Sequence, residues 1–510
     1  MTVVSAAQAA ARDRAAITAG VPSRALMQRA GAAAAGEICR RFGPQLRGGA
    51  AVYAGVGNNG GDGWVVAGAL AAAGVSVRVA AAGEPRSDDA RAERAAALPL
   101  VGDAPPHGGE AVLVDALLGT GSSGPPRGAV GEAMGRLRDG AARGAVVVAL
   151  DVPSGVDAST GRAEGAVRAD ATLTFGTLKR GLLAARDHCG LIAVLDIGLG
   201  VHAALPDGAA SLVTARWVRE RVAPFLADAH KGSRRRVVVL GGAEGLTGAA
   251  VLAARAALRS GVGMVRACVD PASISVVQGA VPAALARRWP TTDGEMADAT
   301  GDWAHAVVAG PGLGRDARAR ELLDRLLRCW RGPLVLDADA LTLFEGRADE
   351  LGALLGGRPA LLTPHVVEFA RLAGGTAQDA LDRRFEAGAD LARRVGATVL
   401  LKGVPTVITA PDGRSLVSAA GTPALATGGS GDVLAGVAAT LLAQSADALV
   451  AGACAAWVHG RAAELAGEGR SLRGVTLDDV IDALGRAWPA DVETPCYPLL
   501  AELPRVGGDA

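Results

Sequence analysis

Short apolar runs alternate with longer segments of helical periodicity along most of this chain. The residues before about position 40 are rich in alanine and predict helix. Short buried strands separated by helices are typical of a mostly parallel sheet covered on both faces, with ligands at the carboxyl ends of its strands. In the first half, the predicted strands are Ala50–Ala54, Val75–Ala80, Ala111–Asp115, Val146–Asp151, Ala171–Phe175 and Ile192–Leu195.

A segment with weaker periodicity divides the chain between about residues 200 and 229. Prolines and glycines interrupt it around the helical run Ala215–Val222, so we interpret it as a linker. The two halves share no motifs, which predicts two different α/β domains, at residues 1–213 and 214–510, rather than a repeat. In the second half, the predicted strands are Arg236–Leu240, Met264–Val269, Ala306–Gly310, Leu334–Asp337, Ala360–Thr363, Val399–Lys402 and Thr406–Thr409.

The composition narrows the class of protein. Half of the 510 residues are hydrophobic and 52 basic residues balance 52 acidic ones, as in a globular protein without a nucleic-acid footprint. The start shows no basic region followed by an apolar core, and no apolar run is long enough to span a membrane. We therefore expect a cytoplasmic protein with no nucleic-acid or membrane partner. The six cysteines have no metal-binding spacing.

A glycine-rich stretch, Gly55–Gly63, follows the first predicted strand and leads into a helical pattern. Glycines let a ligand approach the backbone, and the N–H groups of a helix's first turn attract anions, so such a turn can hold a phosphate. The alternative is a tight connection without a ligand. Asn58 and Asn59 are the only asparagines of the chain, which favours a site that needs carboxamides.

Aspartates end two further strands of the first half. Asp115 follows the third strand and Asp151 the fourth, with Ser154 close behind, and the carboxyl ends of parallel strands meet at one edge. Oxygen ligands without cysteine or histidine suit an alkali or alkaline-earth cation. Taken singly, each aspartate is as easily explained as a helix cap.

The three lysines of the chain, Lys179, Lys231 and Lys402, all lie in glycine-containing turns, while the remaining cationic side chains are arginines. Because the compact ammonium group is not replaced by a planar guanidinium, these lysines suggest contacts with phosphate or a backbone carbonyl. Retention by chance on the surface is the alternative.

In the second half, the most informative motif is Gly428–Asp432, where glycines lead into an apolar helix. Backbone N–H groups there can bind a transferring phosphoryl group while Asp432 accepts a hydroxyl proton. The alternative is that Asp432 only caps the helix. His365, in the Thr-Pro-His sequence at another strand end, has a comparable structural alternative.

With these motifs the chain resembles the bifunctional NAD(P)H-hydrate repair enzymes over nearly its whole length. On the front half, the resemblance rests on Gly57–Gly63, Val114–Gly121, Asp151–Gly155 and Thr174–Gly181. It implies a Rossmann-like three-layer sandwich that interconverts the R and S hydrates of NADH and NADPH, with Asp151 catalytic and K⁺ held by Asn59, Asp115 and Ser154. The implied substrate-binding residues are Asn58, Asn59, Gly60, Gly61, Asp62, Gly119, Thr120, Gly121, Ser122, Ser123, Gly124, Pro125 and Asp151.

On the rear half, the similar segments are His230–Ser233, Gly310–Gly314, Asp337–Leu341, Thr363–His365, Lys402–Thr406 and Gly428–Asp432. The resemblance implies a ribokinase-like α/β domain that dehydrates the S hydrate with Mg²⁺ and ADP or ATP, releasing phosphate, with Asp432 as the base. It also implies a homo-oligomer, a tetramer or larger. The implied substrate-binding residues are Ala250, Gly312, Gly314, His365 and Asp432, and the nucleotide-binding residues are Lys402, Gly403, Val404, Pro405, Thr406, Gly429 and Gly431.

Two departures from the family pattern bear on the rear half. Val366-Val367 replaces Pro-Gly after Thr-Pro-His, and Arg234-Arg235 stands where a glycine and an aromatic are usual. One rival hypothesis is a ribokinase-like kinase for a vitamin precursor with a regulatory front domain. Another is a front domain that binds nucleotides or proteins without catalysis.

Overall fold

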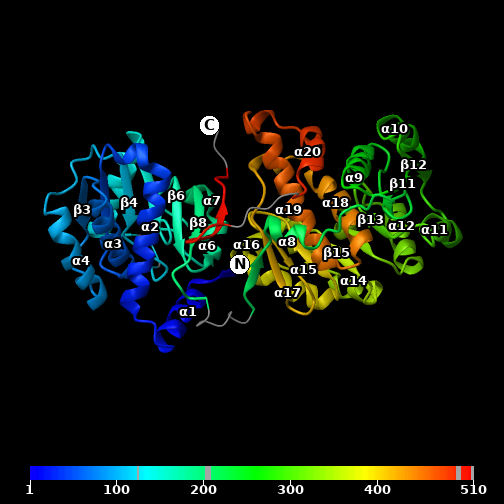
Figure 1. Cartoon of the computed structure of the whole chain (residues 1–510). Coiled ribbons are helices and arrows are strands. Elements are labelled where there is room, and N and C mark those ends of the chain that lie inside the picture. The colour runs from blue at the N-terminus through cyan, green and yellow to red at the C-terminus, as the bar shows by residue number, and fades with distance from the viewer. Residues whose placement is uncertain (123, 125, 201–207, 490–494, 507–510) are drawn as a thin grey trace. The chain divides into compact units, whose positions relative to one another are not determined.

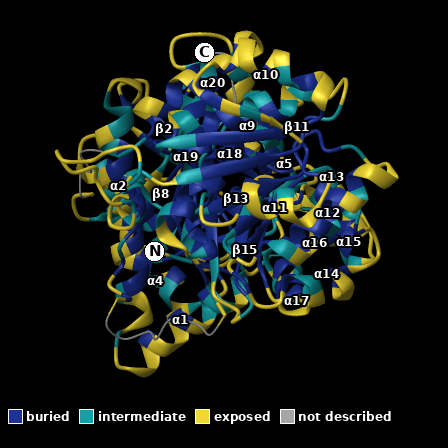
Figure 2. Ribbon diagram, turned by 90° about the vertical axis from the view of Figure 1, so that its right-hand side faces the viewer, coloured by how far each residue is buried: buried dark blue, intermediate teal, exposed yellow. Residues whose placement is uncertain are grey.

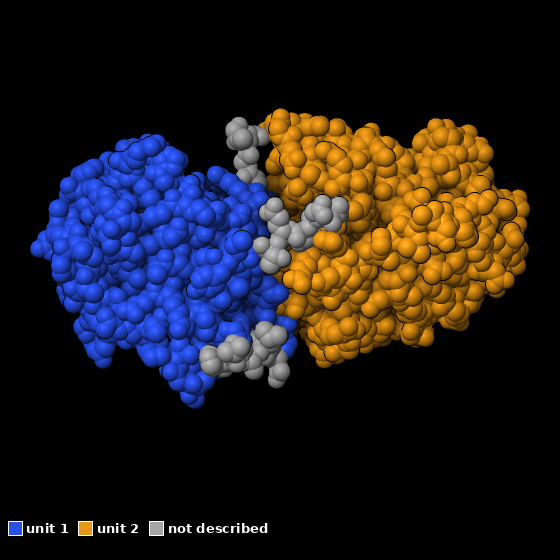
Figure 3. Space-filling model, in the orientation of Figure 1, with its two compact units in different colours: residues 1–209, 493–506 blue, residues 210–492, 507–510 orange. Residues whose placement is uncertain are grey.

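The computed structural model describes the chain except for residues 123, 125, 201–207, 490–494 and 507–510 (Figure 1). The chain forms two compact units, coloured separately in Figure 3. Unit 1 comprises Met1–Ala209 and Glu493–Val506, and unit 2 comprises Ala210–Val492 and Gly507–Ala510. The described residues 495–506, near the end of the sequence, thus belong to unit 1. The division of functions at residues 213 and 214 stays a prediction.

Unit 1 contains a seven-stranded sheet with the order β19-β8-β6-β5-β4-β2-β3. Neighbouring strands are parallel except for β19 against β8. Strands β1 and β7 of this unit form a parallel pair outside that sheet. The strands are β1 Thr2–Val4, β2 Ala50–Ala54, β3 Val77–Ala81, β4 Val112–Ala116, β5 Val146–Leu150, β6 Ala171–Phe175, β7 Leu178–Lys179, β8 Leu191–Leu195 and β19 Leu499–Leu503.

Alternating side chains of the sheet in unit 1 pack against helices on its two faces. Ala50 and Val52 face the cluster that contains α2 and α3, whereas Ala51 and Tyr53 face the cluster that contains α5. The expected three-layer sandwich is therefore confirmed, with the predicted strands shifted by no more than two residues. The helices are α1 Ala6–Thr18, α2 Ser23–Leu46, α3 Asn58–Ala72, α4 Asp88–Val101, α5 Gly128–Ala142, α6 Arg180–Ala184 and α7 Arg186–Cys189.

Unit 2 contains strands in the order β12-β11-β10-β13-β14-β15-β16-β17-β18-β9. They are parallel except where β17 pairs with β16 and with β18. The strands are β9 Ala210–Leu212, β10 Arg236–Leu240, β11 Met264–Val269, β12 Ala284–Arg288, β13 Ala306–Ala309, β14 Leu334–Leu336, β15 Ala360–Leu362, β16 Thr398–Leu401, β17 Thr406–Thr409 and β18 Ser415–Ser418. The described part of the predicted linker contains β9, and β12 and β18 were not predicted.

Helices cover both faces of this sheet as well. Val237 and Val239 pack with α9, α18 and α19, whereas Val238 and Leu240 pack with α12 and α14. Buried residues accordingly fill the strands and the inner sides of these helices (Figure 2). The helices are α8 Ala215–Arg219, α9 Thr247–Arg259, α10 Ile274–Ala280, α11 Asp293–Ala299, α12 Ala317–Cys329, α13 Asp339–Thr342, α14 Ala348–Leu355, α15 Val366–Ala373, α16 Ala377–Asp382, α17 Arg384–Val395, α18 Ser430–Ser445, α19 Ala448–Gly467 and α20 Leu477–Ala483.

Candidate functional sites

The glycine-rich stretch of unit 1 forms the start of a helix rather than a loop. Gly57 is the N-cap of α3, so the predicted site residues 58–62 form its first turn directly behind β2. A Cβ on Gly60 would lie 1.9 Å from the Gly55 carbonyl oxygen, and one on Gly55 would lie 1.8 Å from that of Leu117. These two glycines therefore allow a helix start and two strand ends to pack more closely than side chains permit.

Asn59, Asp115 and Ser154 come together at this edge of the sheet, although they lie far apart in the sequence. The Ser154 hydroxyl and N–H donate to Asp115 Oδ1 at 2.6 Å and Oδ2 at 2.8 Å. Asn59 Nδ2 donates to the carbonyl oxygens of Leu118 at 2.8 Å and Leu150 at 3.1 Å. These two acceptors fix the orientation of the carboxamide.

The orientation of Asn59 leaves its carbonyl oxygen without a partner. Oδ1 of Asn59 is buried and accepts no hydrogen bond from the described residues. Asp115 is fully buried, and burial raises the pKa of its carboxyl group while the hydrogen bonds from Ser154 oppose the rise. An unsatisfied amide oxygen beside a buried carboxyl group suits a hard cation.

Asp151 lies at the end of β5 and contacts a lysine. Lys179 Nζ donates to Asp151 Oδ1 at 2.5 Å, to Thr174 Oγ1 at 3.0 Å and to the Phe175 carbonyl oxygen at 2.9 Å. Lys179 is 3% exposed, so this pair is shielded from water. Asp151 also adopts φ 64°, a left-handed backbone conformation that is uncommon outside glycine. The backbone and the lysine together set the direction of its carboxylate.

A second carboxyl group of the same unit differs from Asp151. Burial raises the pKa of Asp62 well above its usual range, and the negative charges of Asp151 and Asp13 add to the effect. Asp62 therefore holds its proton more tightly than an ordinary aspartate does, while Lys179 pairs with Asp151. Two carboxyl groups in such different environments are suited to act as acid and base.

The predicted segment after β4 contributes to the same region. A Cβ on Gly119 would lie 3.2 Å from the Asn59 side chain and 3.8 Å from Asp151 Oδ2, so this backbone borders both residues. Ser122 Oγ donates to the Gly119 carbonyl oxygen at 2.8 Å and closes a turn. The rest of this predicted segment belongs to the same connection to α5. It comprises Thr120, Gly121 and Gly124, with Ser123 and Pro125 outside the described residues.

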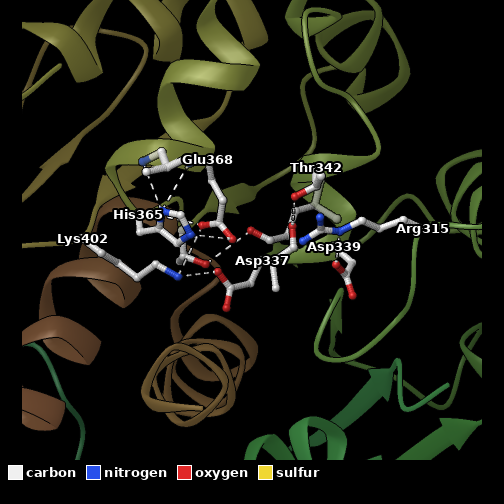
Figure 4. Close-up of polar contacts among 11 residues, drawn as sticks. Arg315, Asp337, Asp339, Thr342, His365, Glu368 and Lys402 are labelled. Carbon is white, nitrogen blue, oxygen red and sulfur yellow. Dashed lines mark hydrogen bonds and ion pairs between the residues drawn. The ribbon is translucent and has the colours of Figure 1, made fainter. Parts of the chain in front are cut away.

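In unit 2, charged side chains gather at the carboxyl ends of β14, β15 and β16 (Figure 4). Lys402 Nζ lies 2.8 Å from Asp337 Oδ1 and 3.8 Å from Glu368 Oε2. Burial lowers the pKa of Lys402, but the charges of Asp337 and Glu368 outweigh it and raise that pKa. Lys402 is therefore cationic and held between two carboxylates.

Asp432 stands in the first turn of α18, next to this cluster. The N-cap of α18 is Gly429, at φ 93°, and the helix has no side-chain cap, so the capping explanation of Asp432 is wrong. A Cβ on Gly431 would lie 3.0 Å from Lys402 Nζ and 3.5 Å from Asp337 Oδ2, which places the glycine turn against the cluster. Burial, together with the charges of Asp337, Asp339 and Glu368, raises the pKa of Asp432 to about 7.

His365 caps α15, so its structural alternative is confirmed as one role. Its Nδ1 accepts the N–H groups of Val367 at 3.1 Å and Glu368 at 3.3 Å, and Glu368 accepts the His365 N–H at 2.8 Å. Nδ1 acts as an acceptor in this cap, and burial lowers the pKa of His365 although the charge of Glu368 opposes the shift. The Val366-Val367 departure therefore keeps the cap, and His365 Nε2 lies 3.4 Å from Glu368 Oε1.

The remaining predicted residues lie around this edge of the sheet. Gly312 and Gly314 adopt left-handed φ angles of 58° and 83°, and the Gly314 N–H donates to Asp339 Oδ2 at 2.9 Å. Arg315 Nε lies 2.8 Å from Asp339 Oδ1 (Figure 4). Ala250 is fully buried in α9, where a Cβ on Gly242 would contact it at 3.0 Å.

The predicted nucleotide turn, residues 402–406, joins β16 to β17. Arg384 donates to the carbonyl oxygens of Lys402 at 3.2 Å and Pro405 at 3.1 Å, and Thr406 Oγ1 donates to that of Gly403 at 3.0 Å. Val404, at the tip, is 59% exposed. The turn is thus rigidly held and presents its tip to solvent.

Four charged residues of the two sites, Lys179, Asp337, Asp339 and Glu368, were not among the predicted site residues. A signal was present for Lys179, because it is one of only three lysines and lies in one of the quoted motifs. The roles of Asp337 and Glu368 depend on Lys402, which is far away in the sequence. No local pattern shows such a contact.

Both units are largely parallel α/β structures with a glycine-rich helix start and carboxyl groups at the ends of strands. This arrangement defines the class of α/β enzymes that act on nucleotides. The family described as NAD(P)H-hydrate dehydratase matches residues 237–486, and the YjeF-related protein N-terminus matches residues 23–181. The chain belongs to the family of bifunctional NAD(P)H-hydrate repair enzymes.

Relatives match over nearly the full length. The bifunctional NAD(P)H-hydrate repair enzyme of Salinibacter ruber is 38% identical over 92% of each chain. That of Escherichia coli is 35% identical over 90% of this chain and 88% of the relative. A solved structure of the ADP/ATP-dependent NAD(P)H-hydrate dehydratase from Bacillus subtilis is 30% identical, covers 55% of this chain and 98% of its own, and gives a TM-score of 0.48.

Two kinds of feature are absent from the described part of the chain. No three histidine, cysteine, aspartate or glutamate side chains are grouped there so as to hold a metal ion. None of the described helices combines the length and apolar character needed to cross a membrane.

Proposed function

We propose that unit 1 epimerises the R and S hydrates of NADH and NADPH, and that unit 2 dehydrates the S hydrate with ADP or ATP. Two different α/β units, each with its own acid–base groups, suit two reactions on one damaged metabolite. The single observation that carries the proposal is Asp432, whose pKa of about 7 makes it an effective base beside a glycine turn at a helix N-terminus.

In the dehydration, Asp432 takes the proton from the hydroxyl group of the hydrated ring. The freed oxygen attacks the terminal phosphoryl group of the nucleotide, and the N–H groups of Gly429 and Gly431 stabilise the negative charge of that group. The bond from this phosphoryl group to the rest of the nucleotide breaks, so AMP leaves when the nucleotide is ADP and ADP leaves when it is ATP. The C–O bond then breaks and phosphate leaves far more easily than hydroxide would. A proton lost from the neighbouring ring carbon restores the double bond of NAD(P)H.

Lys402 and the turn that follows it would hold the nucleotide. The Lys402 ammonium group already lies between Asp337 and Glu368, so a nucleotide phosphate would share this cation rather than find it free. Mg²⁺, when bound with the nucleotide, would neutralise phosphate charge in the transition state. The nearby carboxylates Asp337 and Asp339 provide the hard oxygen ligands that Mg²⁺ prefers.

In the epimerisation, the two carboxyl groups of unit 1 have different roles, Asp62 as the acid and Asp151 as the base. Asp62, whose pKa is raised by burial, would donate a proton to the departing hydroxyl group, and the ring nitrogen would stabilise the resulting cation. Asp151 then accepts a proton from the water that adds to the other face of the ring carbon. Lys179 positions Asp151 through the 2.5 Å contact. The first turn of α3 and the 119–124 connection would hold the pyrophosphate and ribose groups.

A potassium ion would fit between Asn59, Asp115 and Ser154. The oxygen of the Asn59 carboxamide is buried without a donor among the described residues, and a cation would satisfy it. The ion would supply positive charge to the fully buried Asp115.

We propose in addition a cytoplasmic location and a homo-oligomeric state for this enzyme.

The test follows the absorbance of reduced nicotinamide after the protein is mixed with R and S NADH hydrate, K⁺, Mg²⁺ and either ADP or ATP. Complete recovery of NADH requires both activities and identifies the nucleotide. Recovery that stops when the S hydrate is consumed would exclude the epimerase activity that we propose for unit 1. No recovery with either nucleotide, together with a stable phosphorylated product from a vitamin precursor, would favour the kinase hypothesis.

A further inference from the structure

Unit 2 contains a cavity of about 210 Å³ that is separate from the proposed active site. It is lined by the segment after α8, by residues 233–235 before β10, and by the facing sides of α18 and α19. Residues 233–235 precede β10, whereas the catalytic groups follow the carboxyl ends of the strands. The cavity therefore lies at the opposite edge of the same sheet.

Helix α18 gives the separation between the two places. Asp432 is in its first turn, and Gln444, which lines the cavity, is in its last turn. The roughly twelve residues of α-helix between them rise about 18 Å along the axis. A ligand in the cavity thus does not touch Asp432 or the glycine turn.

The charged side chains that line the cavity are all arginines. Arg221, Arg234 and Arg235 contribute to its wall, and no acidic residue does so among the residues that the structure describes. The Arg234 guanidinium lies 4.4 Å from the centroid of the Phe225 ring, and its Nε donates to the Gly261 carbonyl oxygen at 3.1 Å. Neither contact neutralises its charge.

Two acidic groups lie near the cavity without lining it, and one of them pairs with a lining arginine. Glu220 pairs with Arg216 at 3.0 Å and lies 3.5 Å from Arg221. The carboxylate of Asp447 caps α19 by accepting the N–H groups of Leu449 at 2.9 Å and Val450 at 3.0 Å. The excess of positive charge in the wall is therefore only partly balanced.

Gln444 supplies an independent sign of a missing acceptor. Its Nε2 is buried and finds no hydrogen-bond acceptor among the described residues. A buried N–H group without an acceptor is unfavourable, and such groups are rare in folded proteins. Gln444 also lines the cavity, so a rotation of its amide group toward an anion between the arginines would give Nε2 the acceptor that the protein does not.

Arg235 is held in an uncommon backbone conformation at the edge of the cavity. Its φ of 71° lies in the left-handed region, which glycine adopts without strain and a side chain with a Cβ does not. This chain thus has an arginine at a position where a glycine would adopt the same backbone conformation without strain. Residues held in such conformations gather at active sites and ligand sites, where the surrounding structure holds them in place.

We propose that this cavity binds a phosphoryl-bearing small molecule, at a site distinct from the nucleotide site. Three guanidinium groups and one amide offer more donors than a single carboxylate can accept, whereas a phosphoryl group offers three acceptor oxygens in a matching geometry. The volume suits a diphosphate or a compact sugar phosphate rather than a dinucleotide. The proposal does not depend on the reaction assigned to unit 2.

The experiment is a calorimetric titration of inorganic pyrophosphate into the full-length protein, without Mg²⁺. The wild type is compared with the double variant Arg221→Gln/Arg235→Gln and with Arg414→Gln, which removes an exposed arginine that pairs with Asp412 and does not line the cavity. We expect the double variant to lose the tighter binding event by about tenfold or more, since charge-assisted hydrogen bonds are lost, and Arg414→Gln to retain it. ATP binding should be equal in all three proteins.

A second variant separates binding from folding. Gln444→Leu removes the unpaired amide, so the unliganded protein should melt no lower than the wild type while its pyrophosphate affinity falls. Pyrophosphate affinity that is equal in the wild type and both cavity variants would place the anion in the nucleotide site alone and overturn the proposal. Competition of all pyrophosphate binding by ATP would have the same meaning.

Discussion

At the scale of single residues, the two units use the same device to prepare a carboxyl group for proton transfer. Burial raises the pKa of Asp62 in unit 1 and of Asp432 in unit 2, and neighbouring carboxylates strengthen each effect. Each unit also has a lysine that forms an ion pair with one of the neighbouring carboxylates, Lys179 with Asp151 and Lys402 with Asp337. The difference in proton affinity between neighbouring groups is what allows acid–base chemistry near neutral pH.

The substitution Asp432→Asn should abolish dehydration and spare epimerisation. Loss of a positioned base typically lowers a rate by about 10²–10⁴-fold, and the carboxamide keeps the size of the side chain. The rate of NADH recovery from pure S hydrate measures the effect, and the exchange of R and S hydrates measures the other activity. The exposed Asp412→Asn is the matched control. Dehydration within about a factor of two of the wild type would exclude Asp432 as the base.

The rate of dehydration should depend on pH through Asp432. Its pKa is raised to about 7, so the active, ionised form is present above that pH and is lost as the pH falls below it. The profile of kcat/KM should therefore rise with pH and level off above about 8. Asp339→Asn removes one of the charges that raise this pKa and should move the rise to lower pH. A shift to higher pH would contradict the electrostatic explanation.

Lys179→Met should reduce epimerisation and destabilise unit 1. The Asp151 carboxylate would lose its partner in a site where Lys179 is 3% exposed, and breaking a buried pair costs about 3–5 kcal/mol. Melting monitored by circular dichroism gives the stability, and hydrate exchange gives the activity. Lys179→Arg retains the charge and should recover stability more than activity, because the planar fork cannot reproduce three contacts of one ammonium group. Full epimerisation by Lys179→Met would show that the lysine does not position Asp151.

At the scale of elements, both sites use a helix that starts immediately behind a strand or a glycine turn. In α3 the approach is so close that Gly55 and Gly60 leave no room for a Cβ. In α18 the left-handed Gly429 turns the chain into the helix and exposes the N–H groups of the first turn. Glycines thus serve two distinct purposes, close packing in one unit and backbone conformation in the other.

Two substitutions in one turn test whether the close contact of Gly60 matters. Gly60→Ala would place its Cβ 1.9 Å from the Gly55 carbonyl oxygen, so the start of α3 must shift and epimerisation should fall about tenfold or more. A Cβ on Gly57 would meet no atom of the described residues within 4 Å, and Gly57→Ala should cost about 1 kcal/mol or less through the weaker N-cap. Equal effects of the two variants on hydrate exchange would show that the contact is not what matters.

At the scale of the whole molecule, the order of the chain does not follow the order of the units. The last described strand, β19, pairs antiparallel with β8 at the edge of the sheet in unit 1, after the chain has formed unit 2. Arg41 of α2 forms an ion pair with Glu502 of this strand. The stability of unit 1 therefore depends on residues that lie beyond unit 2 in the sequence.

Deletion of residues 495–510 should lower the melting temperature of unit 1 and spare that of unit 2. The edge of β8 would lose its hydrogen-bonded partner, and each 1 kcal/mol lost lowers the melting temperature by about 2–4 °C in a domain of this size. Differential scanning calorimetry, with ATP added to mark the transition of unit 2, measures both. Deletion of residues 507–510 alone, which keeps β19, is the control. A loss confined to unit 2 would contradict the strand pairing.

The sequence by itself determined the two α/β units, the strands of each sheet that carry site residues, and the glycine turns with Asn59, Asp151 and Asp432. These features are local. An apolar run of about five residues, or a glycine motif before a helix, can be recognised in the sequence because the residues that produce it lie within about ten positions of one another. Even the position of Asp432 in the first turn follows from its own motif.

Only the tertiary structure decided which charges face one another. Asp337 follows β14, Glu368 lies in the first turn of α15 and Lys402 follows β16. Their charges act together with burial on the pKa of Asp432. The same holds for Lys179 with Asp151, for the unsatisfied oxygen of Asn59 among the described residues, and for the return of β19 to unit 1. The physical reason is that burial and Coulomb interactions depend on distance in space, which the packing of the sheets fixes and local sequence does not.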